Sequence, residues 1–273
     1  YPKCEYEFSV MPADILGSVY ERFLGKTIRL TAGHQAKVEE KPEVRKAGGV
    51  YYTPKYIVDY IVENTVGKLL EGKTPKEVEK LRICDPACGS GSFLIGAYQY
   101  LLDWHLKYYT DEVSQKIPAS AGMRGPGGEA ITPDGNLTTA LKKRILLNNI
   151  YGVDIDPQAV EVTKLNLLLK ALEGETQASI NQQMTLFHER VLPNLSHNIQ
   201  CGNSLIGPDF YDNQYDLFPD QMKKINAFDW HRAFPEVFKV GASSAEALAK
   251  SGFDAVIGNP PYVRQELLGD QKE

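Results

Sequence analysis

Four stretches of the chain place polar side chains next to glycine or proline, where apolar, strand-like runs are expected to end. They are Asp85–Ser92 (DPACGSGS), Tyr151–Pro157 (YGVDIDP), Cys201–Gly207 (CGNSLIG) and Ile257–Tyr262 (IGNPPY). In an open α/β sheet, ligands bind outside the carboxyl ends of the strands. The spacing therefore predicts one ligand site that is assembled from four strand ends.

The first stretch has an acid at the strand end and lacks the Lys and Ser or Thr that follow the glycines of a phosphate loop. Asp85 disfavours a phosphate and favours a ligand with positive charge. Gly89 and Gly91 let the backbone come close to that ligand, and the next helix N-terminus can hold an anionic part of it. S-adenosylmethionine, a zwitterion with an extra cation, meets these demands. A glycine turn with packing duties alone is the open alternative.

The second stretch contains two acids with different expected roles. Asp154 falls at the strand end, where a dinucleotide-type fold places an acid on ribose hydroxyls. Asp156 precedes Pro157, which is typical of a helix N-cap followed by proline at the first helical position. A D-x-D metal site of a nucleotide-sugar transferase is the alternative, but capping accounts for Asp156 without a metal.

The third stretch offers an amide at the carboxyl edge of its strand. The Asn203 side chain, followed by Ser204, can donate to and accept from an adenine edge at once. A turn former after the strand is the alternative at this position.

The fourth stretch presents hydrogen-bond acceptors on a rigid backbone. The Asn259 side chain and the Pro260 carbonyl can accept hydrogen bonds from an amino group and aim its lone pair at a methyl group. Pro260 and Pro261 hold these acceptors in place, so positioning supplies most of the catalysis. Tyr262 can stack on a planar base, which is worth about 1–3 kcal/mol and is comparable with the cost of unstacking a base from a duplex.

The elements around these stretches alternate between strand and helix, which predicts an α/β fold with a doubly wound, mostly parallel sheet. Helices are expected over residues 137–149 and 157–172 and from about Ser92. Upstream, Ala13–Leu30 predicts a docking helix and Thr31–Gly49 a loop or linker. A further helix is expected with Thr53 as N-cap, Pro54 in its first turn, and an apolar face of Tyr56, Ile57, Tyr60, Ile61 and Val66.

Composition limits the function classes. With 273 residues, 42% of them hydrophobic, the chain is long enough for one sizeable core. Its net charge of −5 argues against a protein that binds nucleic acid over its whole surface. Of the 4 cysteines, Cys84 and Cys201 lie in apolar runs typical of buried thiols, which predicts a cytoplasmic protein. No membrane span or signal peptide is expected. The histidines are scattered and the cysteine spacing is poor for zinc, so no metal is expected.

The motifs, with ILGSVYERFLGK and GVYYTPKYIVDYIV before them, occur in the order found in one known family. The chain resembles the N6-adenine DNA methyltransferases of the gamma amino-methyltransferase class, as found in type I modification subunits and type IIG restriction-modification proteins. The resemblance implies a fold of the class I S-adenosylmethionine-dependent methyltransferase type, with S-adenosylmethionine as cofactor and double-stranded DNA as partner. It implies direct in-line transfer to the N6 of a flipped-out adenine, without a covalent intermediate.

The same resemblance implies a role for each matching residue. Asn203 stands where many relatives have Asp. The implied cofactor-binding residues are Tyr52, Thr53, Pro54, Asp85, Ala87, Gly89, Gly91, Asp154, Ile155, Asn203 and Ser204, and the residues that take the target adenine are Asn259, Pro260, Pro261 and Tyr262.

The resemblance also implies how the chain is divided. Residues 1–48 are expected to be an N-terminal helical segment and linker, and residues 49–273 a catalytic domain that is incomplete at its C-terminus and lacks a target-recognition domain. A specificity or nuclease subunit or domain is a possible further partner. A protein-glutamine N5-methyltransferase and a non-catalytic cofactor-binding scaffold are the alternative functions.

Overall fold

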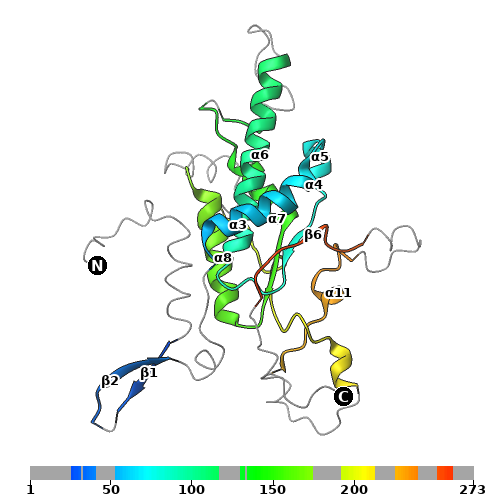
Figure 1. Cartoon of the computed structure of the whole chain (residues 1–273). Coiled ribbons are helices and arrows are strands. Elements are labelled where there is room, and N and C mark those ends of the chain that lie inside the picture. Colours follow the sequence, from blue (N-terminus) through cyan, green and yellow to red (C-terminus); the bar gives the residue numbers. More distant parts are fainter. Residues whose placement is uncertain are drawn as a thin grey trace.

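A computed structural model describes residues 26–31, 33–40, 53–116, 130–132, 134–174, 192–212, 225–238 and 251–260. Its main body is a four-stranded parallel sheet in the order β5-β4-β3-β6 (Figure 1). The strands are β3 (Ile83–Asp85), β4 (Ile150–Asp154), β5 (Ile199–Cys201) and β6 (Ala255–Val256). The strand order reverses between β3 and β6, as in a doubly wound sheet. The parallel sheet with its helices confirms the expected α/β fold.

One face of the sheet carries a layer of helices that share a single apolar core (Figure 1). Successive strand residues point to opposite faces, so Ile83 and Ile150 enter this core while Cys84 and Tyr151 face away from it. Leu94, which is fully buried, belongs to the same core. The layer consists of α3 (Lys55–Val62), η2 (Glu63–Gly67), α4 (Lys68–Leu70), α5 (Pro75–Val78), α6 (Ser92–Lys116), α7 (Thr139–Asn149) and α8 (Pro157–Leu172).

The opposite face is covered by aromatic side chains from residues 225–238, which include the short helix α11 (Trp230–Ala233). Tyr151 of β4 meets Phe234 edge to face, with ring centroids 5.5 Å apart. The η3 turn (Pro208–Tyr211) leads from β5 toward this segment. The sheet is therefore sandwiched between an aliphatic, helical layer and a smaller aromatic one.

Local capping fixes where α8 begins. The Asp156 side chain accepts a hydrogen bond from Gln158 N at 2.9 Å, and Pro157 is the first helical residue. This confirms the predicted N-cap, and α8 spans the predicted residues 157–172.

The start of α3 and part of its buried face differ from the prediction, whereas Val66 is buried as predicted. Pro54, and not Thr53, is at the N-cap position, and the helix has no side-chain cap. Val58 and Val62 are buried, whereas Tyr56 and Tyr60 are 72% and 68% exposed. Gly96 of α6 is the reason, because a Cβ there would lie 2.7 Å from Val58 Cγ1. Because Gly96 has no side chain, Val58 and Val62 can pack against α6, and this contact fixes the rotation of α3 about its axis.

A β-hairpin occupies part of the segment predicted as a helix and a linker. Strands β1 (Lys26–Leu30) and β2 (Ala36–Glu40) pair antiparallel, with Ile28 opposite Val38, and lie apart from the main sheet (Figure 1). The helical prediction for Lys26–Leu30 is therefore wrong, because pairing with a later strand outweighs helical spacing. Residues 13–25 lie outside the described residues, and the division at residue 48 stays a prediction.

The orientation of α3 can be tested by a matched pair of substitutions. Val62→Ala removes buried methyl groups and is expected to lower the free energy of unfolding by about 1–3 kcal/mol. Tyr60→Ala removes a larger but exposed side chain and is expected to change it by less than about 0.5 kcal/mol. Urea unfolding of both variants measures this difference, and a larger loss for Tyr60→Ala would contradict the observed helix face.

Candidate functional site

Asp154, the last residue of β4, joins two of the predicted loops. Its Oδ2 accepts from Gly89 N at 2.8 Å and its Oδ1 accepts from Asp156 N at 2.9 Å. Burial raises the pKa of this carboxyl, and the hydrogen bonds from Asp156 and Gly89 oppose that shift. The acid predicted to bind a ribose therefore also holds the glycine loop against the end of β4.

Two polar side chains of α8 hold the glycine loop after β3 by hydrogen bonds to its backbone. Thr163 Oγ1 donates to Gly89 O at 2.7 Å, and Asn166 Nδ2 donates to Ser90 O at 2.9 Å. Both side chains are fully buried. Sequence reasoning missed them, although two polar residues three positions apart on the apolar face of the helix were a usable signal.

Gly91 is required at this point of the loop. Its φ is +88°, and a Cβ would lie 2.9 Å from Thr163 Cγ2. Gly89 also has positive φ, +54°, but nothing lies within 4 Å of its Cβ position. The backbone at Gly89 therefore faces open space, as a close approach by a ligand requires.

Asp85 is a buried acid at the junction of β3 and β6. It is 1% exposed, and its Oδ1 accepts from Ala87 N at 3.0 Å. Burial raises its pKa to about 7, the Ala87 hydrogen bond opposes the shift, and the Asp154 charge adds to it. A Cβ at Gly258 would lie 2.6 Å from Asp85 Oδ1. The glycine before Asn259 thus allows the end of β6 to lie against this carboxyl.

Asn259 and Thr53 are brought together although 206 positions separate them in the chain. Asn259 Nδ2 donates to Thr53 Oγ1 at 3.1 Å. Thr53 is half-buried, whereas Asn259 and Pro260 are exposed. Two predicted parts of the site, the start of α3 and the end of β6, therefore meet. Tyr52, Pro261 and Tyr262 lie outside the described residues.

The loop after β5 contributes a turn, and the loop after β4 contributes an exposed apolar side chain. Asn203 Oδ1 accepts from Leu205 N at 3.2 Å, so this amide forms a turn, and its contact with a cofactor stays a prediction. Ser204 O accepts from Trp230 Nε1 at 3.1 Å. Ile155, next to Asp154, is 52% exposed.

Cys201 is exposed, so the prediction of a buried thiol is wrong there. It is the last residue of the short strand β5, where burial decreases toward the loop. Cys84 is buried as predicted.

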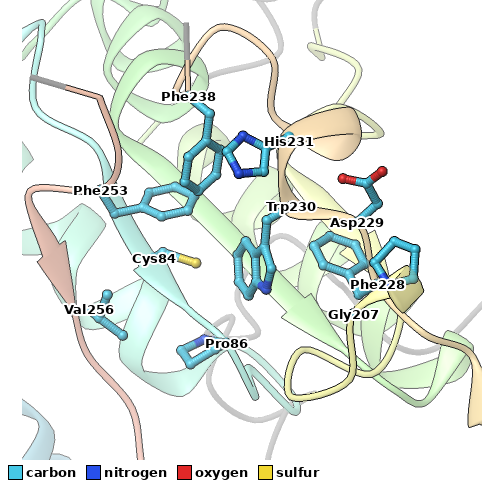
Figure 2. Close-up of a pocket in the computed structure, with 11 residues that line it drawn as sticks. Cys84, Pro86, Gly207, Phe228, Asp229, Trp230, His231, Phe238, Phe253 and Val256 are labelled. Carbon is cyan, nitrogen blue, oxygen red and sulfur yellow. The ribbon is translucent and has the colours of Figure 1, made fainter. Parts of the chain in front are cut away.

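An apolar pocket of about 510 Å³ lies on the sheet face opposite the helical layer. Figure 2 shows its aromatic side chains gathered around Cys84 of β3, with Asp229 and His231 as its ionisable residues. Of the predicted site residues that the structure describes, none lines this pocket. Pro86 and Gly207, which belong to two of the predicted stretches, do line it, so the pocket borders the predicted site.

Two absences hold for the described residues only. No group of three or more His, Cys, Asp or Glu side chains among them could hold a metal ion. None of the described helices is long and apolar enough to cross a membrane.

Two family models match overlapping parts of the chain. Residues 76–199, which hold the glycine loop and Asp154, match the RMKL-like methyltransferase domain, and residues 148–273, which hold Asn259, match the Eco57I restriction-modification methylase. Residues 76–273 thus match methyltransferase families. The chain is similar to the restriction-modification methylases, which confirms the resemblance inferred from its motifs.

Curated relatives agree with this assignment and are much longer. The type II restriction enzyme and methyltransferase RM.Eco57I of Escherichia coli is 34% identical over 98% of this chain and 23% of its own length. A putative enzyme of the same kind from Methanocaldococcus jannaschii, RM.MjaORFECS2P, is 32% identical over 71% of this chain and 16% of its own. The adenine-specific methyltransferase PglX of Streptomyces coelicolor is 22% identical over 80% of this chain and 15% of its own.

The steric difference between the two loop glycines is testable. Gly91→Ala and Gly89→Ala both place a side chain at positive φ, which costs about 1–2 kcal/mol, but only Gly91→Ala adds the clash with Thr163. We expect Gly91→Ala to lower the free energy of unfolding by at least about 1 kcal/mol more than Gly89→Ala. Equal losses in urea unfolding would contradict the close contact with α8.

Asp85 makes stability depend on pH. Its pKa is about 7 in the folded protein against 3.8 for an ordinary Asp, so protonation stabilises the fold. The stabilisation of the fold by the protonated carboxyl is fully present below about pH 4 and is lost as the pH rises through about 7. Asp85→Asn removes this dependence. Its free energy of unfolding is expected to rise relative to the wild type across this window, by on the order of 2–4 kcal/mol. Urea unfolding at pH 4, 6 and 8 measures the difference, and a constant difference would contradict the raised pKa.

Proposed function

We propose that this chain is the catalytic region of an S-adenosylmethionine-dependent methyltransferase that modifies the N6 of a flipped-out adenine in DNA. The observation that carries the proposal is the contact of Asn259 with Thr53, directly after Gly258, which lies against the Asp85 carboxyl at the sheet edge that also holds the glycine loop. The strand order β5-β4-β3-β6 supports a Rossmann-like fold of the class I methyltransferase type.

The residues at the edge fit the cofactor. The open space over Gly89 admits a ligand to the backbone, and the buried Asp85 favours a positive charge nearby. Asp154 keeps acceptor capacity for ribose hydroxyls, because each carboxylate oxygen has two lone pairs. Ile155 offers an exposed apolar side chain for the adenine ring. Tyr52, Thr53, Pro54, Ala87, Gly91, Asn203 and Ser204 complete the proposed cofactor site. The cofactor supplies an electrophilic methyl group on a positively charged sulfur.

The end of β6 orients the acceptor of the methyl group. Asn259 Oδ1 and the Pro260 carbonyl are proposed to accept the two N6 hydrogens, which directs the nitrogen lone pair at the methyl carbon. This nitrogen would take the methyl group from a bound cofactor, and one N6 proton would be lost to solvent. Pro260 and Pro261 restrict the backbone, and Tyr262 is proposed to stack on the base.

The relatives support DNA as the substrate and adenine as the base. RM.Eco57I is named as a restriction enzyme and methyltransferase, and PglX and the BrxX protein of Escherichia coli are named as adenine-specific methyltransferases. A homologous type I methylase subunit from Methanocaldococcus jannaschii supports a further subunit or domain as partner. Since the chain spans about a quarter or less of these relatives, the substrate and partners of the whole protein are part of the proposal.

The test uses the full-length protein with methyl-labelled S-adenosylmethionine and either unmethylated DNA or a protein extract, followed by hydrolysis of each product. Label in N6-methyladenine is the expected outcome. Label in methylglutamine would move the assignment to a protein-glutamine methyltransferase. Cofactor binding without any label would favour a non-catalytic scaffold.

Asn259→Ala tests the role of the amide in the same assay. The turnover rate is expected to fall at least about 100-fold, because a group that acts on the reacting centre is lost, while the Kd for the cofactor stays within about threefold. Asn148→Ala, which removes an amide that contacts Glu79, is the control and is expected to behave as wild type. Comparable activity of Asn259→Ala and the wild type would refute the proposed role.

A further inference from the structure

We propose that Thr53 is a positioning residue that fixes which end of the Asn259 amide faces the target base. The inference rests on the proposed function and adds a role for Thr53 beyond a cofactor contact. It starts from the hydrogen bond in which Asn259 Nδ2 donates to Thr53 Oγ1 at 3.1 Å. This contact joins the start of α3 to the end of β6.

The two ends of a carboxamide have nearly the same shape and opposite hydrogen-bonding character. The oxygen only accepts and the nitrogen only donates, and a rotation of 180° about the terminal bond exchanges them. An amino group of a base needs an acceptor, so Oδ1 must face it. With Nδ2 on Thr53, Oδ1 points away from Thr53, and the amide has the polarity that an amino substrate requires.

The hydroxyl of Thr53 can maintain this polarity. A hydroxyl has one donor hydrogen and two acceptor lone pairs. If its hydrogen is directed to an anionic acceptor, the oxygen can only accept from Asn259, which excludes the reversed amide. The carboxylate of the methionine portion of S-adenosylmethionine is such an acceptor in the proposed function. A bound cofactor would therefore set the orientation of Asn259 through Thr53.

The backbone segments that carry Thr53 and Asn259 are each held in place by neighbouring hydrogen bonds and a buried side chain. On the α3 side, the Pro54 carbonyl accepts from Ile57 N at 2.9 Å, and the helix is anchored by the buried Val58. On the β6 side, Ile257 N donates to Cys84 O at 2.9 Å, and the Ile257 side chain is 3% exposed. Two rigid backbones therefore present one exposed amide and one hydroxyl to each other, which is the arrangement expected of a positioning contact.

The rate test uses the full-length protein in single-turnover methyl transfer with saturating cofactor and DNA. Thr53→Val keeps the side-chain shape but loses the hydroxyl, and its rate is expected to fall about 10-fold or more. Thr53→Ala is expected to show the same loss, and Thr53→Ser, which keeps the hydroxyl, is expected to stay within about threefold of wild type. Thr65→Val is the control, because the Thr65 hydroxyl donates to Ile61 O within the helix and not to the site.

A second measurement, the binding of two DNA duplexes, reports the orientation of the Asn259 amide and is insensitive to a general loss of structure. Hypoxanthine at the target position replaces the amino group of adenine by an oxygen that accepts, so Oδ1 should disfavour it. The wild type is expected to bind an adenine duplex more tightly than the hypoxanthine duplex, and Thr53→Val is expected to reduce this preference at least threefold by letting the amide rotate. A merely structural role would weaken binding of both duplexes by the same factor.

The outcomes separate this inference from the proposed function. A Thr53→Val enzyme with a rate within twofold of wild type, or with an unchanged preference for adenine, would overturn the positioning role while N6-methyladenine is still formed. A wild-type protein that forms no N6-methyladenine would instead overturn the proposed function, and with it the role inferred for Thr53.

Discussion

The two hydrogen bonds accepted by Asp154 are the constraint on which the candidate site depends. They tie the glycine loop after β3 to the loop after β4, so the two strand ends form one surface. The carboxyl is partly desolvated, which raises its pKa, and the backbone donors stabilise its ionised form. Loss of this acid would remove the side-chain hydrogen bond between the two loops, whereas Thr163 and Asn166 would still hold the glycine loop against α8.

The contacts between α8 and the glycine loop show how the buried face of a helix supports an exposed site. Thr163 and Asn166 use polar atoms at the inner face of α8 to satisfy two loop carbonyls. Because buried polar groups are costly unless paired, these hydrogen bonds define a single loop geometry. Gly91 then brings the loop into contact with Thr163. The support is rigid, and the ligand-facing backbone at Gly89 stays open.

The sheet separates two environments by strand alternation. Cys84 faces the aromatic layer and the apolar pocket, whereas Asp85 lies at the carboxyl edge against the end of β6. Neighbouring residues of one strand thus serve a packed apolar surface and a polar site. The aromatic pocket in Figure 2 is lined by none of the described candidate site residues, although Pro86 on its wall directly follows Asp85.

Local sequence determined the features whose physics is local. The N-cap at Asp156, the bounds of α8, the glycine loop and the polar strand ends follow from capping, φ preferences and apolar periodicity, which act within a few residues. Tertiary structure decided the buried face of α3, the pairing of β1 with β2, the Thr163 and Asn166 contacts and the hydrogen bond between Thr53 and Asn259. Each of these depends on a partner distant in sequence, such as Gly96 for Val58, and a periodic pattern cannot identify that partner.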